Sequence, residues 1–279
     1  MSLSWNESMR VALCPDGVGI VRMSRGRQRL LEKNAATGVA VDHEPLWAGA
    51  VDALRTGLGG VGLGGVAAPA RDVTIVLSNH FVRYLLIPGN DALAGPEEEL
   101  AHAGHCFTRV YGDAAEAWEI RLSTGNGGQQ VACAIDKELL SNLDQAVAAS
   151  GRHLHSVQPY LMAAFNRWRR EFSEPLVWFI LAEPGRLCLA ALQNGNWRHL
   201  VNLQTHADWS DSLPELLARQ RLLTGLDDVP GEVCVFASDR EEAEQALQQS
   251  GEKVRGLCLA PLPETPPAEV AYLEMAMNG

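Results

Sequence analysis

The chain has 279 residues, of which 47% are hydrophobic and 20% charged, and its formal net charge is −11 at pH 7. These proportions are typical of a globular protein, and the length allows one large domain or two lobes, each with its own core. The acidic balance argues against sequence-independent binding of nucleic acid or anionic lipid, because both need a basic surface.

Cysteine spacing and hydropathy indicate where the chain works. The six cysteines include no Cys-x-x-Cys pair, so neither a zinc site nor a dithiol redox motif is predicted. Reduced, buried thiols are usual in a cytoplasmic protein. The N-terminus shows no basic and apolar leader, and no window of about 18 apolar residues could span a bilayer. We therefore expect a cytoplasmic chain whose membrane role, if any, is mediated by a partner.

The first part of the chain begins with strands. Val11–Met23 predicts two strands around a turn at Pro15-Asp16-Gly17, and Arg27–Lys33 is compatible with a third. A helix is expected to start at Leu46–Leu54, and the glycine-rich segment Gly57–Gly65 is typical of a loop. Further strands are expected at 73–77, 81–87, 118–122, 130–135 and 153–157, with helices at 96–110, 136–149 and 159–170.

Two of these helices carry start and stop signals. Pro96 suits a first helical turn, and the three glutamates that follow favour the positive end of the helix dipole. Asp136 is a suitable N-cap, and Gly151 a suitable stop for the same helix.

The pattern changes after Pro175. Three strands are predicted in quick succession, at 177–181, 187–192 and 197–203, with turns at 183–186 and 194–196. Helices at 212–223 and 239–249 then alternate with strands at 233–236 and 253–257, and a last helix is predicted at 267–277.

The two halves have the same outline. Each begins with a three-stranded meander and continues with alternating helices and strands, which predicts an α/β, actin-like (ribonuclease H-like) duplicated fold with mixed sheets flanked by helices. The first lobe is expected at 1–172, with an inserted subdomain at about 81–135, and the second lobe at 173–279. The C-terminal helix at 267–277 could return to the first lobe.

A family resemblance rests on several strings taken in order. They are Leu77–Pro88, then Tyr111-Gly112 and Trp118, and downstream Ala134–Leu140 and Leu154–Pro159. This series resembles the pilus-assembly proteins of the PilM type and the cytoplasmic domain of the type II secretion platform protein GspL, both in the actin-like ATPase superfamily. The resemblance covers most of the chain, from about residue 11 to the C-terminus.

The resemblance implies a role as well as a fold. A PilM-type protein lies on the cytoplasmic face of a bacterial inner-membrane platform, and a short cytoplasmic segment of a membrane protein docks in a groove of its first lobe. The lack of a membrane span is similar to the PilM arrangement and differs from GspL, which continues into a span. The expected partner is therefore the cytoplasmic segment of a single-span inner-membrane protein; the groove residues and the oligomeric state stay open.

Nucleotide binding in an actin-like ATPase needs two glycine-containing hairpins whose backbone N–H groups wrap the phosphates, usually with an aspartate that helps to hold Mg²⁺. In the first hairpin the candidates are Asp16 and Gly17, but Cys14 stands where the PilM-type pattern has its aspartate, and Pro15 removes a donor. The hairpin is therefore predicted to be degenerate.

The second hairpin is similar in composition. Its candidates are Glu183 and Gly185, while Leu181 is expected at the strand end and Pro184 again lacks a donor. Two such hairpins predict a degenerate member of the superfamily, with no catalytic residue and no metal ligand assigned. ATP with Mg²⁺ is the cofactor that these four candidate residues would serve.

An enzymatic alternative stays open, in which the chain is an actin-like ATPase or a small-molecule kinase with weak nucleotide binding. A kinase would need an aspartate at the start of a helix between the lobes, and Asp136 occupies such a position. The string Gly57–Gly62 matches G-x-G-x-x-G but follows a helix and precedes a strand, the reverse of a dinucleotide site. His102 and His105 share a helix face with Glu98, as either metal ligands or a solvated surface.

Overall fold

The computed structural model describes residues 7–24, 30–37, 45–60, 72–90, 93, 95–123, 128–206, 208–238, 240–259 and 265–278. Contacts between α-carbons divide the chain into two compact units. The first comprises residues 1–82, 135–167 and 261–279, and the second comprises residues 83–134 and 168–260. Each unit is therefore assembled from segments that are far apart in the sequence.

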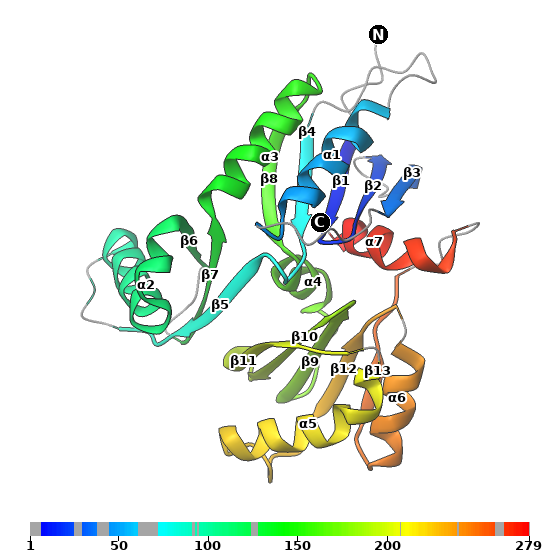
Figure 1. Ribbon diagram of the computed structural model, residues 1–279. Helices are drawn as coiled ribbons and strands as arrows, with labels where there is room; N and C mark the ends of the chain where they lie inside the picture. Colours follow the sequence, from blue (N-terminus) through cyan, green and yellow to red (C-terminus); the bar gives the residue numbers. More distant parts are fainter. Residues whose placement is uncertain are drawn as a thin grey trace. The chain divides into compact units, whose positions relative to one another are not determined.

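The sheet of the first unit has the strand order β3-β2-β1-β4-β8 (Figure 1). Its strands are β1 (Glu7–Cys14), β2 (Gly17–Ser24), β3 (Leu30–Thr37), β4 (Asp72–Leu77) and β8 (His153–Pro159). β1, β2 and β3 form an antiparallel meander, whereas β1, β4 and β8 are parallel. The parallel strands are joined through helices, as parallel connections require.

Helices cover both faces of this sheet, as the alternation along β2 shows. The side chain of Ile20 points toward Gly57 of α1 (Ala48–Gly60), whereas Gly17 and Gly19 face Tyr272 of α7 (Pro267–Asn278). Successive residues of a strand point to opposite faces, so α1 and α7 lie on opposite sides of β2. α3 (Lys137–Ala149) packs beside α1, and α4 (Tyr160–Trp168) follows β8.

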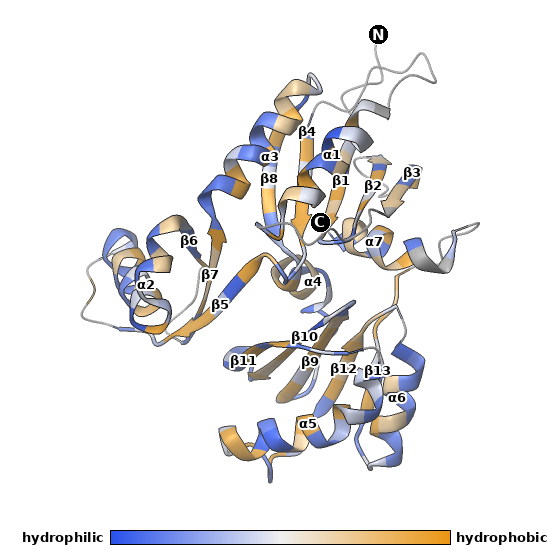
Figure 2. Cartoon of the chain, viewed as in Figure 1, coloured by the Kyte–Doolittle hydropathy of each residue, from blue (hydrophilic) through white to orange (hydrophobic). Residues whose placement is uncertain are grey.

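The second unit repeats this order with β11-β10-β9-β12-β13. Its strands are β9 (Leu176–Glu183), β10 (Arg186–Gln193), β11 (Asn196–Gln204), β12 (Glu232–Phe236) and β13 (Val254–Gly256). β9, β10 and β11 are antiparallel, and β9, β12 and β13 are parallel, as in the first sheet. Figure 2 shows apolar residues concentrated on the interior strands β4 and β12 and mixed residues on the helices.

One face of the second sheet packs against α5 (Trp209–Thr224) and α6 (Arg240–Gln249). Its core includes the fully buried Trp178, Ile180 and Val235. The other face carries Phe179 and Phe236, and Phe236 packs on Trp168 with ring centroids 5.6 Å apart. Both faces of the sheet are therefore apolar, as expected of a sheet covered on two sides.

A third sheet, with the order β5-β7-β6, comes from the predicted insert (Figure 1). It consists of β5 (Val82–Ile87), β6 (Trp118–Leu122) and β7 (Gln130–Asp136), and α2 (Pro96–Tyr111) supplies the other part of its core. Phe107 of α2 is fully buried and meets Trp118 edge to face at 6.4 Å. Arg83 lies over the same indole, 4.2 Å from the ring centroid, a cation–π contact.

Both predicted meanders and the alternating order that follows each are confirmed. The prediction for the glycine-rich segment is wrong in part. Gly57 to Gly60 are helical, because α1 runs through Gly60, while residues 61–65 lie outside the described residues. The third strand covers Leu30–Thr37, so residues 30–33 of the expected range are confirmed as strand, and residues 27–29 lie outside the described residues. Burial of Leu54 and Leu58 against the sheet overrides the weak helix propensity of glycine in α1.

Candidate functional site

The first candidate turn joins β1 to β2 in the first unit. Cys14 pairs with Gly17, so the turn itself contains only Pro15 and Asp16. The side chain of Cys14 is buried at the end of β1, while Pro15 and Asp16 are half-buried. Asp16 therefore lies within the turn, and a thiol occupies the strand end where the resemblance implies an aspartate.

The second candidate turn joins β9 to β10 in the second unit. Glu183 pairs with Arg186, so this turn contains only Pro184 and Gly185. Gly185 has a φ of 76°, which together with proline before it is the signature of a type II turn. The carbonyl of Gly185 accepts a hydrogen bond from the backbone N–H of Thr205 at 3.2 Å.

The strand end in the second hairpin differs from the expected one. β9 runs to Glu183, and Leu181 is a fully buried residue in its interior. By register, Glu183 at the end of β9 corresponds to Cys14 at the end of β1. The second turn thus has a carboxylate at its strand end, and the first has one only inside the turn. The prediction ended the strand too early because the apolar run of β9 stops at Ala182. The last residue pair before the turn, Glu183 with Arg186, is charged and gives no strand signal.

Backbone donors are scarce at both turns. A phosphate-binding nest is built from successive backbone N–H groups that converge on one anion. Pro15 and Pro184 have no N–H, so each two-residue turn supplies a single donor, that of Asp16 or of Gly185. The residues present do not fit the wrapped phosphates of an actin-like ATPase.

Helix α7 lies directly against the first turn. A Cβ atom at Gly17 would come within 2.9 Å of Tyr272 Cζ, and one at Gly19 within 2.7 Å of the Tyr272 carbonyl. Such distances are shorter than van der Waals contact, so both positions need glycine for α7 to pack this closely. The hydroxyl of Tyr272 donates a hydrogen bond to the Asp16 carboxylate. Burial, and next the charge of Asp16, raise the pKa of Tyr272, so the phenol is protonated at neutral pH.

Sequence reasoning missed Tyr272 altogether. The contact joins residues near opposite ends of the chain, and periodicity in α7 predicts a helix without indicating which side chain reaches the turn. The two glycines at alternate positions of β2 were the available signal, because a close backbone approach requires them. That signal predicts a close contact on β2 but does not indicate which residue makes it.

Asp136 and His102 make local contacts within their own helices. Asp136 is the N-cap of α3, and its Oδ1 accepts hydrogen bonds from the backbone N–H groups of Glu138 at 2.7 Å and Leu139 at 3.4 Å. His102 Nε2 lies 3.8 Å from Cys106 Sγ, one turn further along α2. Among the residues that the structure describes, no group of three or more His, Cys, Asp or Glu side chains is arranged to hold a metal ion.

Over the described ranges, no helix combines the length and the hydropathy that crossing a membrane would need.

Comparison with known proteins gives similarity in structure alone. No protein-family model matches the sequence, and no curated protein is significantly similar to it. A PilM–PilN type IV pilus biogenesis complex contains a chain that aligns over 97% of this chain and 96% of its own length, with a TM-score of 0.70 and 13% identity. A Bacteroides thetaiotaomicron protein of actin-like ATPase fold and unknown function aligns over 91% of each chain, with a TM-score of 0.64 and 10% identity.

The cytoplasmic domain of EpsL, an inner-membrane component of the type II secretion system of Vibrio cholerae, is also similar. It aligns over 82% of this chain and 81% of its own length, with a TM-score of 0.55 and 11% identity. The chain therefore has an actin-like fold. Within that fold class, its architecture is of the type seen in PilM and the EpsL cytoplasmic domain, as the resemblance implied.

Proposed function

We infer that the chain is a non-catalytic cytoplasmic scaffold of a bacterial type IV pilus or type II secretion inner-membrane platform. In this role it binds the cytoplasmic segment of a single-span membrane protein. The similarity to a chain of the PilM–PilN complex over 97% of the sequence, and to the EpsL cytoplasmic domain, supports the system and the class of partner.

The observation that carries the non-catalytic part is the state of the two turns. Each is a two-residue turn that begins with proline, so neither offers the run of N–H donors that a triphosphate needs. The carboxylate of Asp16, the acidic group inside the first turn, already accepts a hydrogen bond from Tyr272. A fold kept without its phosphate-binding groups is best explained by a role in assembly.

A weak nucleotide-binding protein, either an ATPase or a small-molecule kinase, is the second candidate. One observation favours it: Glu183 lies at the end of β9 directly before the turn that contains Gly185. A carboxylate at a strand end beside a left-handed glycine is a position from which a hydrated Mg²⁺ could be held. The missing N–H of Pro184 counts against it.

The scaffold role predicts a specific interaction with a membrane protein. The immobilised full chain should enrich a single-span inner-membrane protein from solubilised membranes of the source bacterium, relative to a bait of equal net charge. A synthetic peptide of that protein's cytoplasmic segment should then bind the purified chain with one-to-one stoichiometry in isothermal titration calorimetry, without added nucleotide. Failure of the peptide to bind, or enrichment of soluble proteins only, would contradict the scaffold role.

A further inference from the structure

Helix α7 is anchored to the meander of the first unit at both of its ends. Near its start, Lys33 Nζ of β3 donates a hydrogen bond to the hydroxyl of Thr265. At its end, Arg10 Nη1 of β1 donates to the carbonyl of Met277 at 3.1 Å. The last carbonyls of a helix have no partner within the helix, and a cation is favourable there. The two contacts span the meander from β3 to β1.

Between these ends, α7 covers the strands beside the first turn. Cys14 Sγ lies 3.7 Å from Met275 Sδ, and both side chains are buried. Tyr272 is 6% exposed and packs against the two glycines of β2. The ring of Tyr272 faces Gly17, its backbone lies against Gly19, and its hydroxyl binds the carboxylate of Asp16.

We propose that α7 is an internal ligand of the β1–β2 turn: Tyr272 packs on the glycine surface beside the turn and binds the carboxylate of Asp16, and the turn is not a phosphate site. The glycines of β2 leave backbone with no side chain beside the turn, which is the kind of surface that accepts a ligand closely. In this chain the occupant is covalently part of the protein. The order of the first unit then depends on the docking of α7 and is independent of nucleotide, and this inference rests on the non-catalytic function proposed above.

Hydrogen exchange measured by mass spectrometry tests the proposal on the full chain. The peptides to follow cover residues 7–24 and 265–278. Tyr272→Ala removes the ring and should accelerate exchange in both peptides by about tenfold or more, because undocking opens them together. Tyr272→Phe keeps the ring and removes only the hydroxyl, so it should accelerate exchange less. Tyr111→Phe, which removes the hydroxyl of a partly exposed tyrosine in the other unit, is the matched control and should change neither peptide.

Each variant is then measured with millimolar ATP and Mg²⁺. The expected result is that nucleotide does not slow exchange in the wild type or in either Tyr272 variant. Slower exchange in the Tyr272 variants alone would show that the turn is a phosphate site with which α7 competes, and would overturn the proposal. Unchanged exchange of residues 7–24 in Tyr272→Ala would overturn it as well. Neither outcome concerns the membrane partner, whose absence would contradict only the scaffold role.

Discussion

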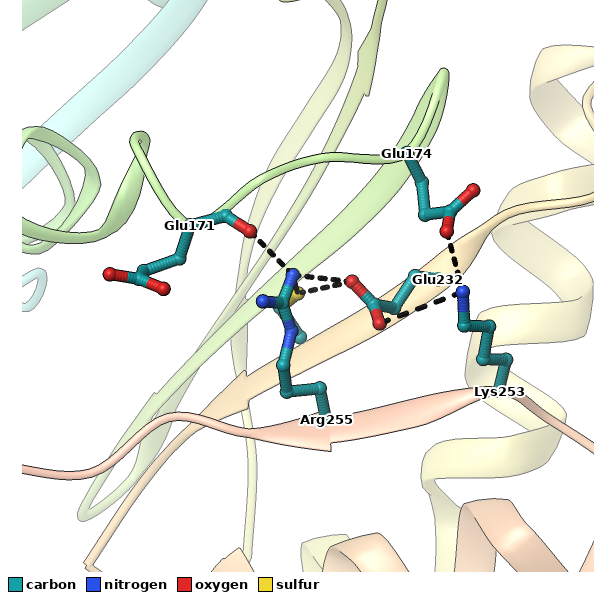
Figure 3. Close-up of polar contacts among 6 residues, drawn as sticks. Glu171, Glu174, Glu232, Lys253 and Arg255 are labelled. Atoms are coloured by element: carbon teal, nitrogen blue, oxygen red, sulfur yellow. Dashed lines mark hydrogen bonds and ion pairs between the residues drawn. The ribbon is translucent and has the colours of Figure 1, made fainter.

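Replacing Glu232 by glutamine is expected to lower the free energy of unfolding by about 2–3 kcal/mol, because it removes the largely buried carboxylate that forms an ion pair with Arg255. The Glu232 side chain is 9% exposed, and its Oε2 accepts a hydrogen bond from Arg255 Nη2 (Figure 3). The same nitrogen donates to the carbonyl of Glu171 at 2.6 Å. Arg255 is itself 32% exposed, so the loss should fall below that of a fully buried pair.

The neighbouring thiol does not replace that carboxylate. Cys234 Sγ lies 3.7 Å from both Glu232 Oε2 and Arg255 Nη2 (Figure 3). Burial is the main cause that raises the pKa of Cys234 to about 12, so the thiol is neutral at physiological pH. The positive charge of Arg255 is therefore compensated by the carboxylate of Glu232 and not by the thiol.

Urea unfolding followed by circular dichroism measures this effect. Glu174→Gln is the matched control, because Glu174 accepts a hydrogen bond from Lys253 at 2.6 Å but is 36% exposed. An exposed pair contributes little, so the control should unfold near the wild-type midpoint. Equal midpoints for Glu232→Gln and Glu174→Gln would show that the buried carboxylate has no special role.

The second large effect is expected at Gly19. Gly19→Ala would place a Cβ atom 2.7 Å from the backbone carbonyl of Tyr272, and a backbone atom cannot move aside as a flexible side chain can. Either α7 shifts or β2 deforms, and such overpacking costs about 1–3 kcal/mol. We expect a lower urea midpoint together with faster hydrogen exchange in residues 265–278.

Gly59→Ala is the matched control for this substitution. Nothing lies within 4 Å of the Cβ position at Gly59, which is in α1. Alanine is the better helix former by up to about 1 kcal/mol, so this variant should be as stable as the wild type or more stable. If Gly19→Ala behaved like Gly59→Ala, the close packing of α7 on β2 would be wrong.

Local signals were sufficient for most of the fold. Pro96 and Asp136 mark the starts of α2 and α3, and the two meanders give the sheets a common order that the structure confirms. The local signals failed where tertiary packing determines the end of a helix or strand. α1 continues through Gly60 because its apolar face packs on the sheet, and β9 extends past Leu181 to complete a hairpin.

The site was predicted only in part. The two prolines and the positions of Asp16 and Gly185 could be assigned from sequence, because turns depend on local residue chemistry. The partner of Asp16 could not, since Tyr272 lies near the other end of the chain and reaches the turn only through tertiary packing. Amphipathic periodicity indicates that a helix packs but not against which strand.

Titration of the purified wild-type chain with ATP and Mg²⁺, with phosphate release followed in the same samples, tests the central claim most directly. A scaffold with two proline-interrupted turns should give no binding heat below millimolar nucleotide and no phosphate release above the buffer rate. Sub-millimolar binding that Asp16→Ala abolishes, accompanied by phosphate release, would contradict the non-catalytic account.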